Sequence, residues 1–368
     1  MGTMSEPLTR AELTIDLGAV ARNWSRLNDI TAGAETAAMV KSDGYGTGAV
    51  EAAEALCDAG CREFFVAYVA EAVALRRAHP DVDIVVLAGA PPGTLDDLVH
   101  NDLIPVLLDL GQLERWTGRA RAEGRKLRAS IHLDTGMNRT GFDRQETERL
   151  ISDLTPLESL DIVHVMSHLA SADDPETDQN TRQLAAFQDL RSVLAMGRAS
   201  LANTPGIALG PAYHFDHVRP GVGLYGADPS PDRSLDLHPV VHLAAPVLQV
   251  RSVRAGDTVG YGATHTVAGE RRVATVAVGY GDGFFRSQSG RGHVAFDGEV
   301  APIVGRVSMD LITVDITDLP AEVAVVPGTA AELIGATVTI DDVAEAAETI
   351  PYEVLTALGH RYRRHHIR

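Results

Sequence analysis

One lysine stands at the end of a short apolar run and is followed by closely spaced glycines, in the stretch Ala37–Gly48. An amine that follows buried residues beside a turn is partly desolvated, which lowers its pKa and suits it to act as a Schiff-base nucleophile. The glycines after Lys41 let the backbone bend tightly and turn its N–H groups toward an anion such as a phosphate. A solvated strand-end lysine is the ordinary alternative, so this stretch alone leaves both interpretations open.

The segments that must position Lys41 alternate between apolar runs and stretches with helical periodicity. The strand-like runs are residues 37–41, 64–69, 84–87, 104–108, 129–133, 162–166, 200–202 and 217–222. Strands that alternate with helices predict βαβ units and a parallel sheet. Units of this number and size fit a closed (β/α)₈ barrel, which takes about 250 residues, although periodicity does not exclude a doubly wound open sheet.

Most of these runs end at or near a reactive or anion-binding residue type. The residues concerned are Lys41, Asp134 with Arg139, Ser167 with His168, Asn203 with Thr204, and Arg219 with Gly221. In a barrel the carboxyl ends of all strands converge on one face, where barrel enzymes keep their active sites. This placement favours the barrel over the open sheet and predicts a site at that face.

The character of the chain changes after Tyr225-Gly226. A stretch rich in Pro, Asp and Ser, residues 227–238, resembles a linker. Short β-branched runs follow at 246–253, 258–261, 273–278, 293–296, 302–307, 312–316, 331–334 and 337–340, with helical periodicity only at 340–358. We therefore expect an α/β barrel domain over residues 1–235 and a mainly antiparallel β domain over 236–368, which the first strand, near 12–17, could join.

Composition limits the possible partners. The net charge is −18, which disfavours nucleic acid and anionic membranes. No apolar run is long enough for a bilayer, and Met1–Arg10 lacks the apolar stretch of a secretory signal, so we expect a cytoplasmic protein. Cys57 and Cys61 have no nearby pair of histidines, and we predict no metal site.

Three further features have both a structural and a chemical interpretation. The stretch Gly221–Gly226 is a poor dinucleotide fingerprint because it opens no helix, but it suits a single phosphate at the end of an eighth barrel strand. Arg219 and His168 could be a salt-bridge partner and a hydrogen-bonded core residue, or they could face a ligand. Tyr261 lies between glycines, where its phenol would be accessible.

Together these stretches resemble the alanine racemase family, whose members use pyridoxal 5'-phosphate and combine an N-terminal barrel with a C-terminal β domain. The resemblance spans nearly the whole chain. It rests on six segments in the family's order: Met39–Gly46, Asp134–Phe142, Met166–Asp173, Val218–Gly226, Val278–Gly283 and Gly305–Asp310.

The resemblance implies that Lys41 binds the cofactor covalently and acts as a base on one face of the substrate α-carbon. Tyr261, supplied by the other subunit of a head-to-tail homodimer, would be the base on the opposite face. Racemisation needs such a pair, because a proton removed on one side must be returned on the other.

The resemblance also implies a set of binding residues. Arg219 would bond the pyridine nitrogen without protonating it, which weakens the ring as an electron sink and disfavours transamination. The other implied cofactor-binding residues are Tyr45, Arg139, His168, Asn203, Thr204, Gly221, Val222 and Tyr352. Substrate would meet Arg139, Met309 and Tyr352, and the entrance would be lined by Tyr280, Arg306 and Asp173.

One departure from the family pattern concerns His132, two residues before Asp134. Many relatives carry there a lysine that becomes carbamylated and steadies the arginine at position 139. A histidine forms no such stable carbamate, so a chloride, a water or His132 itself would have to brace Arg139. Ser308, Thr204 and Asn138 are milder departures.

The leading hypothesis is therefore a homodimeric isomerase that interconverts L- and D-alanine, for synthesis of peptidoglycan precursors or for D-alanine breakdown. A racemase of broader specificity, acting for example on serine, is the nearest alternative, although Met309 and Tyr352 argue for a small pocket. A carrier protein that binds the cofactor without catalysis would lack Tyr261 and the whole β region. A decarboxylase is disfavoured by the order of Tyr261, Tyr280 and Met309-Asp310.

Overall fold

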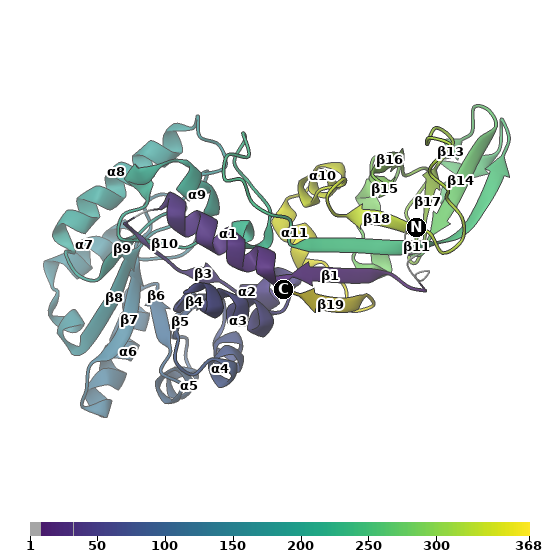
Figure 1. The fold of residues 1–368 in the computed structure, drawn as a ribbon. Helices are drawn as coiled ribbons and strands as arrows, with labels where there is room; N and C mark the ends of the chain where they lie inside the picture. Colours follow the sequence, from purple (N-terminus) through teal and green to yellow (C-terminus); the bar gives the residue numbers. More distant parts are fainter. Residues whose placement is uncertain (1–8, 32) are drawn as a thin grey trace. The chain divides into compact units, whose positions relative to one another are not determined.

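The chain forms two compact units in a computed structural model that describes residues 9–31 and 33–368 (Figure 1). The first, which we call the barrel unit, comprises Val20–Leu224 and Asp228–His238. The second, the β unit, comprises residues 9–19, 225–227 and 239–368. Each unit is described below by itself.

The strands of the barrel unit form one parallel sheet in the order β2-β10-β9-β8-β7-β6-β5-β4-β3. Only Ala37 separates β2 from β3, so these two segments are halves of one strand. The Ala37 N–H donates to the Val218 oxygen (3.1 Å) on one side, and the Val40 N–H donates to the Phe65 oxygen (2.9 Å) on the other. This strand therefore joins both ends of the sheet and closes the ring, which confirms the (β/α)₈ barrel and excludes the open sheet.

The barrel strands are β2 (Glu35–Thr36), β3 (Ala38–Met39), β4 (Glu63–Val66), β5 (Asp83–Val86), β6 (Ile104–Leu107), β7 (Leu127–His132), β8 (Leu160–Met166), β9 (Arg198–Ser200) and β10 (His217–Val218). The helices are α1 (Leu17–Ile30), α2 (Lys41–Gly46), α3 (Ala49–Ala59), α4 (Val69–Ala78), α5 (Leu95–His100), α6 (Leu110–Glu123), α7 (Arg144–Ser152), α8 (Asp178–Val193) and α9 (Thr204–Ala208). In Figure 1, α3 to α8 lie outside the ring of strands.

Side-chain caps fix where several of these helices begin. The Asp109 carboxylate accepts from the Gln112 N–H (2.7 Å) at the start of α6. At α7, Asp143 and Glu146 form a reciprocal capping box. Such caps satisfy N–H groups that have no partner within the helix, so each helix starts at a defined distance from the strand before it.

The β unit is built around the long strand β11 (Val241–Val253), which pairs antiparallel with β1 (Glu12–Asp16), β14 (Arg271–Val276) and β18 (Ala330–Ile334). The remaining strands are β12 (Thr258–Val259), β13 (His265–Thr266), β15 (His293–Phe296), β16 (Glu299–Pro302), β17 (Ile312–Asp315) and β19 (Arg363–Ile367). Its helices are α10 (Ile340–Ala346) and α11 (Pro351–Thr356). Only β1 and β19 pair in parallel, so the prediction of a mainly antiparallel region is confirmed.

Two strands expected in this region are wrong. Of the run 302–307, Pro302 ends β16, which pairs with β15 through residues 299–302, and Ile303 makes a single antiparallel bridge to Val314, after which the chain leaves the sheet. The run 337–340 is a turn that leads into α10, where Thr339 forms the helix cap. The helical stretch 340–358 is broken in two by Pro351, which starts α11 because it has no N–H to continue a helix.

Two compositional expectations can be compared with the structure. Within the described residues, no helix is both long enough and apolar enough to cross a bilayer. Cys57 and Cys61 are free thiols. Burial raises the pKa of Cys61 to about 12, so this thiol is chemically inert at neutral pH.

Candidate active site

Lys41 follows β3 and opens a turn with unusual backbone geometry. The next four residues have positive φ: Ser42 (53°), Asp43 (54°), Gly44 (61°) and Tyr45 (54°). Left-handed helical conformation costs roughly 1–2 kcal/mol for each residue that carries a Cβ, so a single left-handed turn must be held by its surroundings.

Glu71, on α4, supplies part of that support. One of its carboxylate oxygens accepts from the Ser42 N–H (2.8 Å), and the other accepts from the N–H groups of Ala67 (2.7 Å) and Tyr68 (3.2 Å). The carboxylate thereby ties the turn after Lys41 to the end of β4. This role could not be predicted from the sequence, because a glutamate on a helix surface is normally solvated.

The Lys41 amine has a lowered pKa. Burial is the largest cause and the positive charge of Arg139 the next, while Glu71 opposes both. A lowered pKa increases the neutral fraction of the amine, which is the form that attacks a carbonyl or accepts a proton. The sequence contains two lysines, and the other, Lys126, is exposed on the surface.

The left-handed turn places the Tyr45 hydroxyl beside the loop that follows β10. A Cβ on Gly221 would lie 2.4 Å from the Tyr45 Oη, so only glycine fits there. The Thr204 hydroxyl accepts from the N–H groups of Gly221 (2.9 Å) and Gly223 (3.3 Å). A phenol, a hydroxyl and main-chain N–H groups therefore converge in the way that suits a phosphate.

Asn203 and Val222 frame this cradle. The Asn203 side chain accepts from the Gly206 N–H (3.0 Å) and caps α9, which fixes the loop carrying Thr204. The Val222 side chain is fully buried. Asn203 therefore positions the loop that carries Thr204. Direct contact of Asn203 or Val222 with a ligand stays a prediction.

Arg219 follows β10 and is 1 % exposed. Its Nη1 donates to the Ser200 hydroxyl, and its Nη2 donates to the Ser167 oxygen (2.6 Å) and approaches His168 Nδ1 (3.4 Å). Its Nε is buried and has no hydrogen-bond partner among the described residues. Burial lowers the pKa of Arg219 to about 10, so the guanidinium stays charged at neutral pH and offers one unused donor.

His168 and His132 lie in the electrostatic field of this cation. Desolvation, followed by the charge of Arg219, holds the pKa of His168 well below 6.5. The same two causes, in the same order, lower the pKa of His132 to about 4. Both imidazoles are therefore neutral at physiological pH, and His168 can pack against a ligand without adding charge.

Arg139 lies in an exposed loop that folds back on the end of β7. The Asp134 carboxylate accepts from three successive N–H groups, of Gly136 (2.9 Å), Met137 (2.9 Å) and Asn138 (3.1 Å), and so fixes the loop. No side chain in residues 9–31 or 33–368 hydrogen-bonds the Arg139 guanidinium. No hydrogen bond from His132 to Arg139 is present in this part of the structure, so what braces Arg139 stays a prediction.

In the β unit, Tyr261 projects from a turn and is 74 % exposed. Its neighbours Gly260 and Gly262 have φ of 76° and 72°. A Cβ on Gly262 would lie 2.8 Å from the Arg306 guanidinium, so Arg306 packs across the turn. The expected accessibility of the phenol is confirmed, and Arg306 is brought close to it.

Tyr280 and Met309 come together through their main chains. The Tyr280 N–H donates to the Ser308 oxygen (3.0 Å), and the Gly281 N–H donates to the Met309 oxygen (2.8 Å). Arg361 binds both loops, with Nε 3.1 Å from Asp282 and Nη1 2.9 Å from Asp310. The sequence predicted both loops as functional segments but missed Arg361, whose partners are distant in the chain.

The last two predicted residues lie at the surfaces of their units. Asp173 is exposed in the loop between β8 and α8, and Tyr352 is half-buried in the first turn of α11. The barrel unit thus gathers Lys41, Tyr45, Thr204, Arg219 and Gly221 near the carboxyl ends of its strands. The β unit carries Tyr261, Tyr280, Arg306, Met309 and Tyr352.

Comparison with known proteins identifies the family. Residues 15–229 match the alanine racemase N-terminal domain, and residues 240–366 match the alanine racemase C-terminal domain. The chain belongs to the alanine racemase family.

Alanine racemases of known sequence and structure are similar over almost the full length. The enzyme of Brucella suis is 45% identical over 366 residues, covering 96% of this chain and 92% of that protein. The enzyme of Acidiphilium cryptum is 46% identical over 352 residues, covering 96% and 97%. A crystal structure of alanine racemase from Bartonella henselae with covalently bound pyridoxal phosphate has a TM-score of 0.92 at 39% identity, covering 98% of this chain and 100% of that one.

We expect the unusual His132 of this alanine racemase family member to make the protein acid-sensitive. The folded pKa is about 4 and the ordinary value 6.5, so unfolding takes up a proton between these values and stability falls as pH drops from 6.5 toward 4. The loss is about 1 kcal/mol per pH unit, up to about 3 kcal/mol.

Urea unfolding of the apoprotein at pH 7.5 and pH 5.0 measures this effect. The His132→Gln variant should lose less stability between the two pH values than the unaltered protein. His100→Gln, at an exposed position, serves as the matched control. An acid loss in His132→Gln equal to that of the control would contradict the assignment.

Proposed function

We propose that Lys41 and Tyr261 exchange the α-proton of alanine from opposite faces of its α-carbon. The chain is an isomerase of the alanine racemase family that interconverts L- and D-alanine with pyridoxal phosphate as cofactor. When bound, the cofactor supplies an electron-withdrawing ring that makes the α-proton of the amino acid acidic enough for a side chain to remove. The proposal concerns which residues of this chain hold that cofactor and move the proton.

The barrel unit offers one protein group for each reactive part of the cofactor. Lys41 supplies an amine of lowered pKa for the aldehyde. Tyr45, the Thr204 hydroxyl and the Val222 N–H would supply donors for the phosphate, and the Gly221 N–H, which donates to Thr204 in this structure, would join them by turning to the phosphate. The unused Arg219 Nε supplies a donor for the ring nitrogen. The residues therefore fit the cofactor.

The observation that carries the proposal is the combination of the desolvated Lys41 amine with the unpartnered Arg219 Nε. A fully buried guanidinium with an unused donor is costly, because an unmade hydrogen bond to a charged group forfeits about 1.5–3 kcal/mol. A ligand acceptor would recover this free energy. Since an arginine donor does not release its proton, the ring nitrogen it contacts stays unprotonated.

Proton transfer then needs two bases. A single base returns the proton to the face from which it came, so inversion requires a second group on the opposite face. Tyr261 is the candidate because its phenol is highly exposed on a turn whose flanking glycines have positive φ. We propose that it serves the active site of a second copy of the chain, which makes the enzyme a homodimer with shared sites.

The remaining residues bind and orient. We propose that His168 packs on the cofactor ring, that Asn203 and Tyr352 contribute to cofactor binding, and that Arg139 bonds the phenolic oxygen of the cofactor. Met309 and Tyr352 would crowd the substrate side chain and favour alanine over larger amino acids. Tyr280, Arg306 and Asp173 would line the entrance.

A barrel-only carrier protein does not account for residues 240–366, which match the family's C-terminal domain. We therefore retain catalysis as the function. A cytoplasmic location and the supply of D-alanine for peptidoglycan precursors complete the proposal, since D-alanine is the product of the reaction.

Replacing Lys41 with Ala should remove the visible absorbance of the holoenzyme, because Lys41 is the amine that would bind the cofactor covalently. Lys126→Ala is the matched control, since it removes the only other lysine of the chain and lies on the surface. Absorbance spectra of both purified variants with added pyridoxal phosphate give the answer. A visible band retained in Lys41→Ala would exclude Lys41 as the attachment point.

Tyr261→Phe should slow proton exchange from one enantiomer of alanine much more than from the other, by about a hundredfold or more, because it removes the base from only one face. Washout of the α-hydrogen into deuterated water, followed separately for L- and D-alanine, measures this asymmetry. Tyr68→Phe, at another exposed tyrosine, is the control. Equal slowing for both enantiomers would argue against bases on opposite faces.

Hybrid dimers test whether the sites are shared. Mixing the inactive Lys41→Ala and Tyr261→Phe proteins under conditions of subunit exchange should restore about a quarter of the normal activity, because half of the dimers are hybrids and each hybrid has one intact site. Differently tagged subunits allow the hybrid to be isolated. An isolated hybrid without activity would show that Lys41 and Tyr261 act within one chain.

A further inference from the structure

The buried charge of Arg219 has no carboxylate in contact. In the described part of the chain no Asp or Glu forms an ion pair with it, and the charged groups that act on its neighbour His168 are the cations Arg139 and Lys41. An uncompensated buried cation costs several kcal/mol. The one carboxylate that raises the pKa of Arg219, against the lowering effect of burial, is Glu63.

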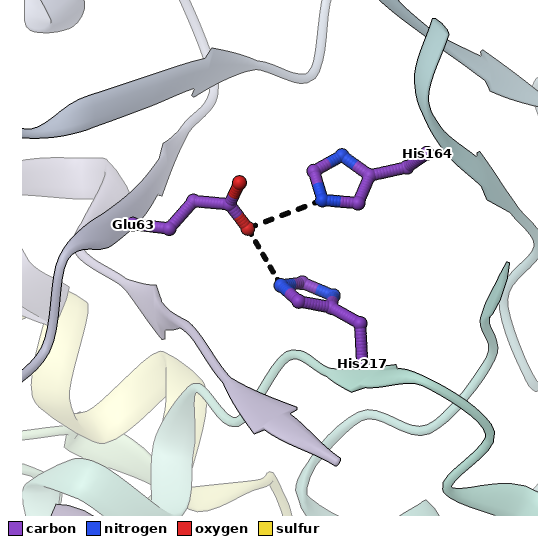
Figure 2. A group of neighbouring side chains, drawn as sticks. All are labelled: Glu63, His164 and His217. Carbon is purple, nitrogen blue, oxygen red and sulfur yellow. Dashed lines mark ion pairs between the residues drawn. The ribbon is translucent and has the colours of Figure 1, made fainter. Parts of the chain in front are cut away.

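Glu63 lies inside the ring of strands. Figure 2 shows its carboxylate between the imidazoles of His164 and His217. Its Oε2 is 3.2 Å from His164 Nε2 and 2.6 Å from His217 Nε2. These side chains come from β4, β8 and β10, and because β4 and β8 are not neighbours in the sheet, their side chains meet across the interior.

A proton, and not a metal ion, fits between Glu63 and His217. Two ligands of one Zn²⁺, each about 2.0–2.1 Å from it, stand more than 3 Å apart, whereas Glu63 Oε2 and His217 Nε2 form an ion-pair contact of 2.6 Å, although neither atom makes a hydrogen bond of regular geometry among the described residues. The place of a cation in the cluster is also taken, because Arg198 Nη2 lies 2.8 Å from Glu63 and 2.9 Å from His164.

A series of contacts leads from Arg219 through Ser200 and His217 to Glu63. The groups at its two ends limit which atoms donate and which accept. Although burial raises it, the contacts with His164 and His217 hold the pKa of Glu63 far below its ordinary value, so Glu63 is a carboxylate that only accepts. Burial lowers the pKa of His217 to about 4, so this imidazole is neutral. We place its single proton on Nε2, because that atom lies 2.6 Å from an oxygen of the Glu63 carboxylate.

With the proton on Nε2, the hydrogen bonds between His217, Ser200 and Arg219 have one arrangement. His217 Nδ1 must accept, and the Ser200 hydroxyl donates to it (2.9 Å), sharing its proton with the His217 main-chain oxygen (2.9 Å). The Ser200 oxygen in turn accepts from Arg219 Nη1. The hydrogen bonds thus lead from Arg219 through Ser200 to His217, whose Nε2 contacts the Glu63 carboxylate, and aligned polar groups polarise one another in a medium of low dielectric constant.

We propose that Glu63 is the counter-ion of Arg219 and that, through His217 and Ser200, it positions the guanidinium so that Nε faces the cofactor. This inference rests on the proposed contact between Arg219 and the ring nitrogen. Because Ser200 is held by His217, it receives Nη1 in one orientation only, and the guanidinium plane is fixed. Glu63 is thus a positioning residue that touches neither substrate nor cofactor.

A double-mutant cycle on cofactor affinity tests the proposal. The apoprotein is titrated with pyridoxal phosphate for the unaltered chain, Glu63→Gln, Ser200→Ala and the double variant, and circular dichroism checks that each is folded. Each single substitution should weaken binding about tenfold, as expected for a lost hydrogen bond to a charged group. The double variant should also be about tenfold weaker and not about a hundredfold, because both changes break one chain.

Glu35→Gln is the matched control, because the Glu35 side chain contacts Arg198 in the same cluster but makes no hydrogen bond or ion pair with His217 or Ser200 among the described residues. Its cofactor affinity should be unchanged. If Glu63→Gln does not fold, His217→Gln combined with Ser200→Ala gives the same cycle one step nearer to Arg219. Unchanged affinity in folded Glu63→Gln, effects that multiply in the double variant, or one bound metal ion per purified chain would overturn the proposal.

Arg219→Lys separates this inference from the proposed function. If Arg219→Lys weakens cofactor binding but Glu63→Gln does not, only the role of Glu63 fails. If Arg219→Lys leaves the affinity unchanged, the contact between Arg219 and the ring nitrogen fails and the inference fails with it.

Discussion

The burial of one positive charge at the centre of the barrel constrains much of the site. Arg219 is held by oxygen acceptors from two neighbouring strand ends, Ser167 and Ser200, and no carboxylate of the described residues is in contact with it. Its field lowers the pKa of His168 and His132 after desolvation has done so, and both stay neutral. In the proposed function, such a cationic donor would hold the cofactor ring nitrogen unprotonated, which would limit how far the cofactor withdraws electrons and would suit racemisation.

A second unfavourable feature, besides the buried charge of Arg219, is the strained backbone of the turn that follows Lys41. A left-handed turn of four residues is unfavourable for the three that carry a Cβ, but it places the Tyr45 hydroxyl beside Gly221 in the loop after β10. Glu71 helps to offset the cost by accepting the Ser42 N–H. The strain and its support come from different elements, so the turn exists only in the folded barrel.

In the β unit, exposed side chains are held in defined positions by the main chain beneath them. Glycines allow this by close backbone contact: a Cβ on Gly279 would lie 2.3 Å from the Ser308 oxygen. Arg361 then locks the loops through Asp282 and Asp310. Tyr280 and Met309 can be exposed and still be well positioned, because the main chain beneath them is fixed.

The sequence by itself determined the order of elements, since strand and helix periods are local properties, and it indicated Lys41, Arg219 and Tyr261 through their neighbours in the chain. Prediction from the sequence was wrong where a short β-branched run is compatible with either a strand or a turn, as in the runs 302–307 and 337–340. Only the tertiary structure decided what Glu71, Glu63 and Arg361 do. Their partners lie far away in the sequence, and whether a carboxylate or a guanidinium is solvated or bound depends on what the closed barrel and the packed sheets bring beside it.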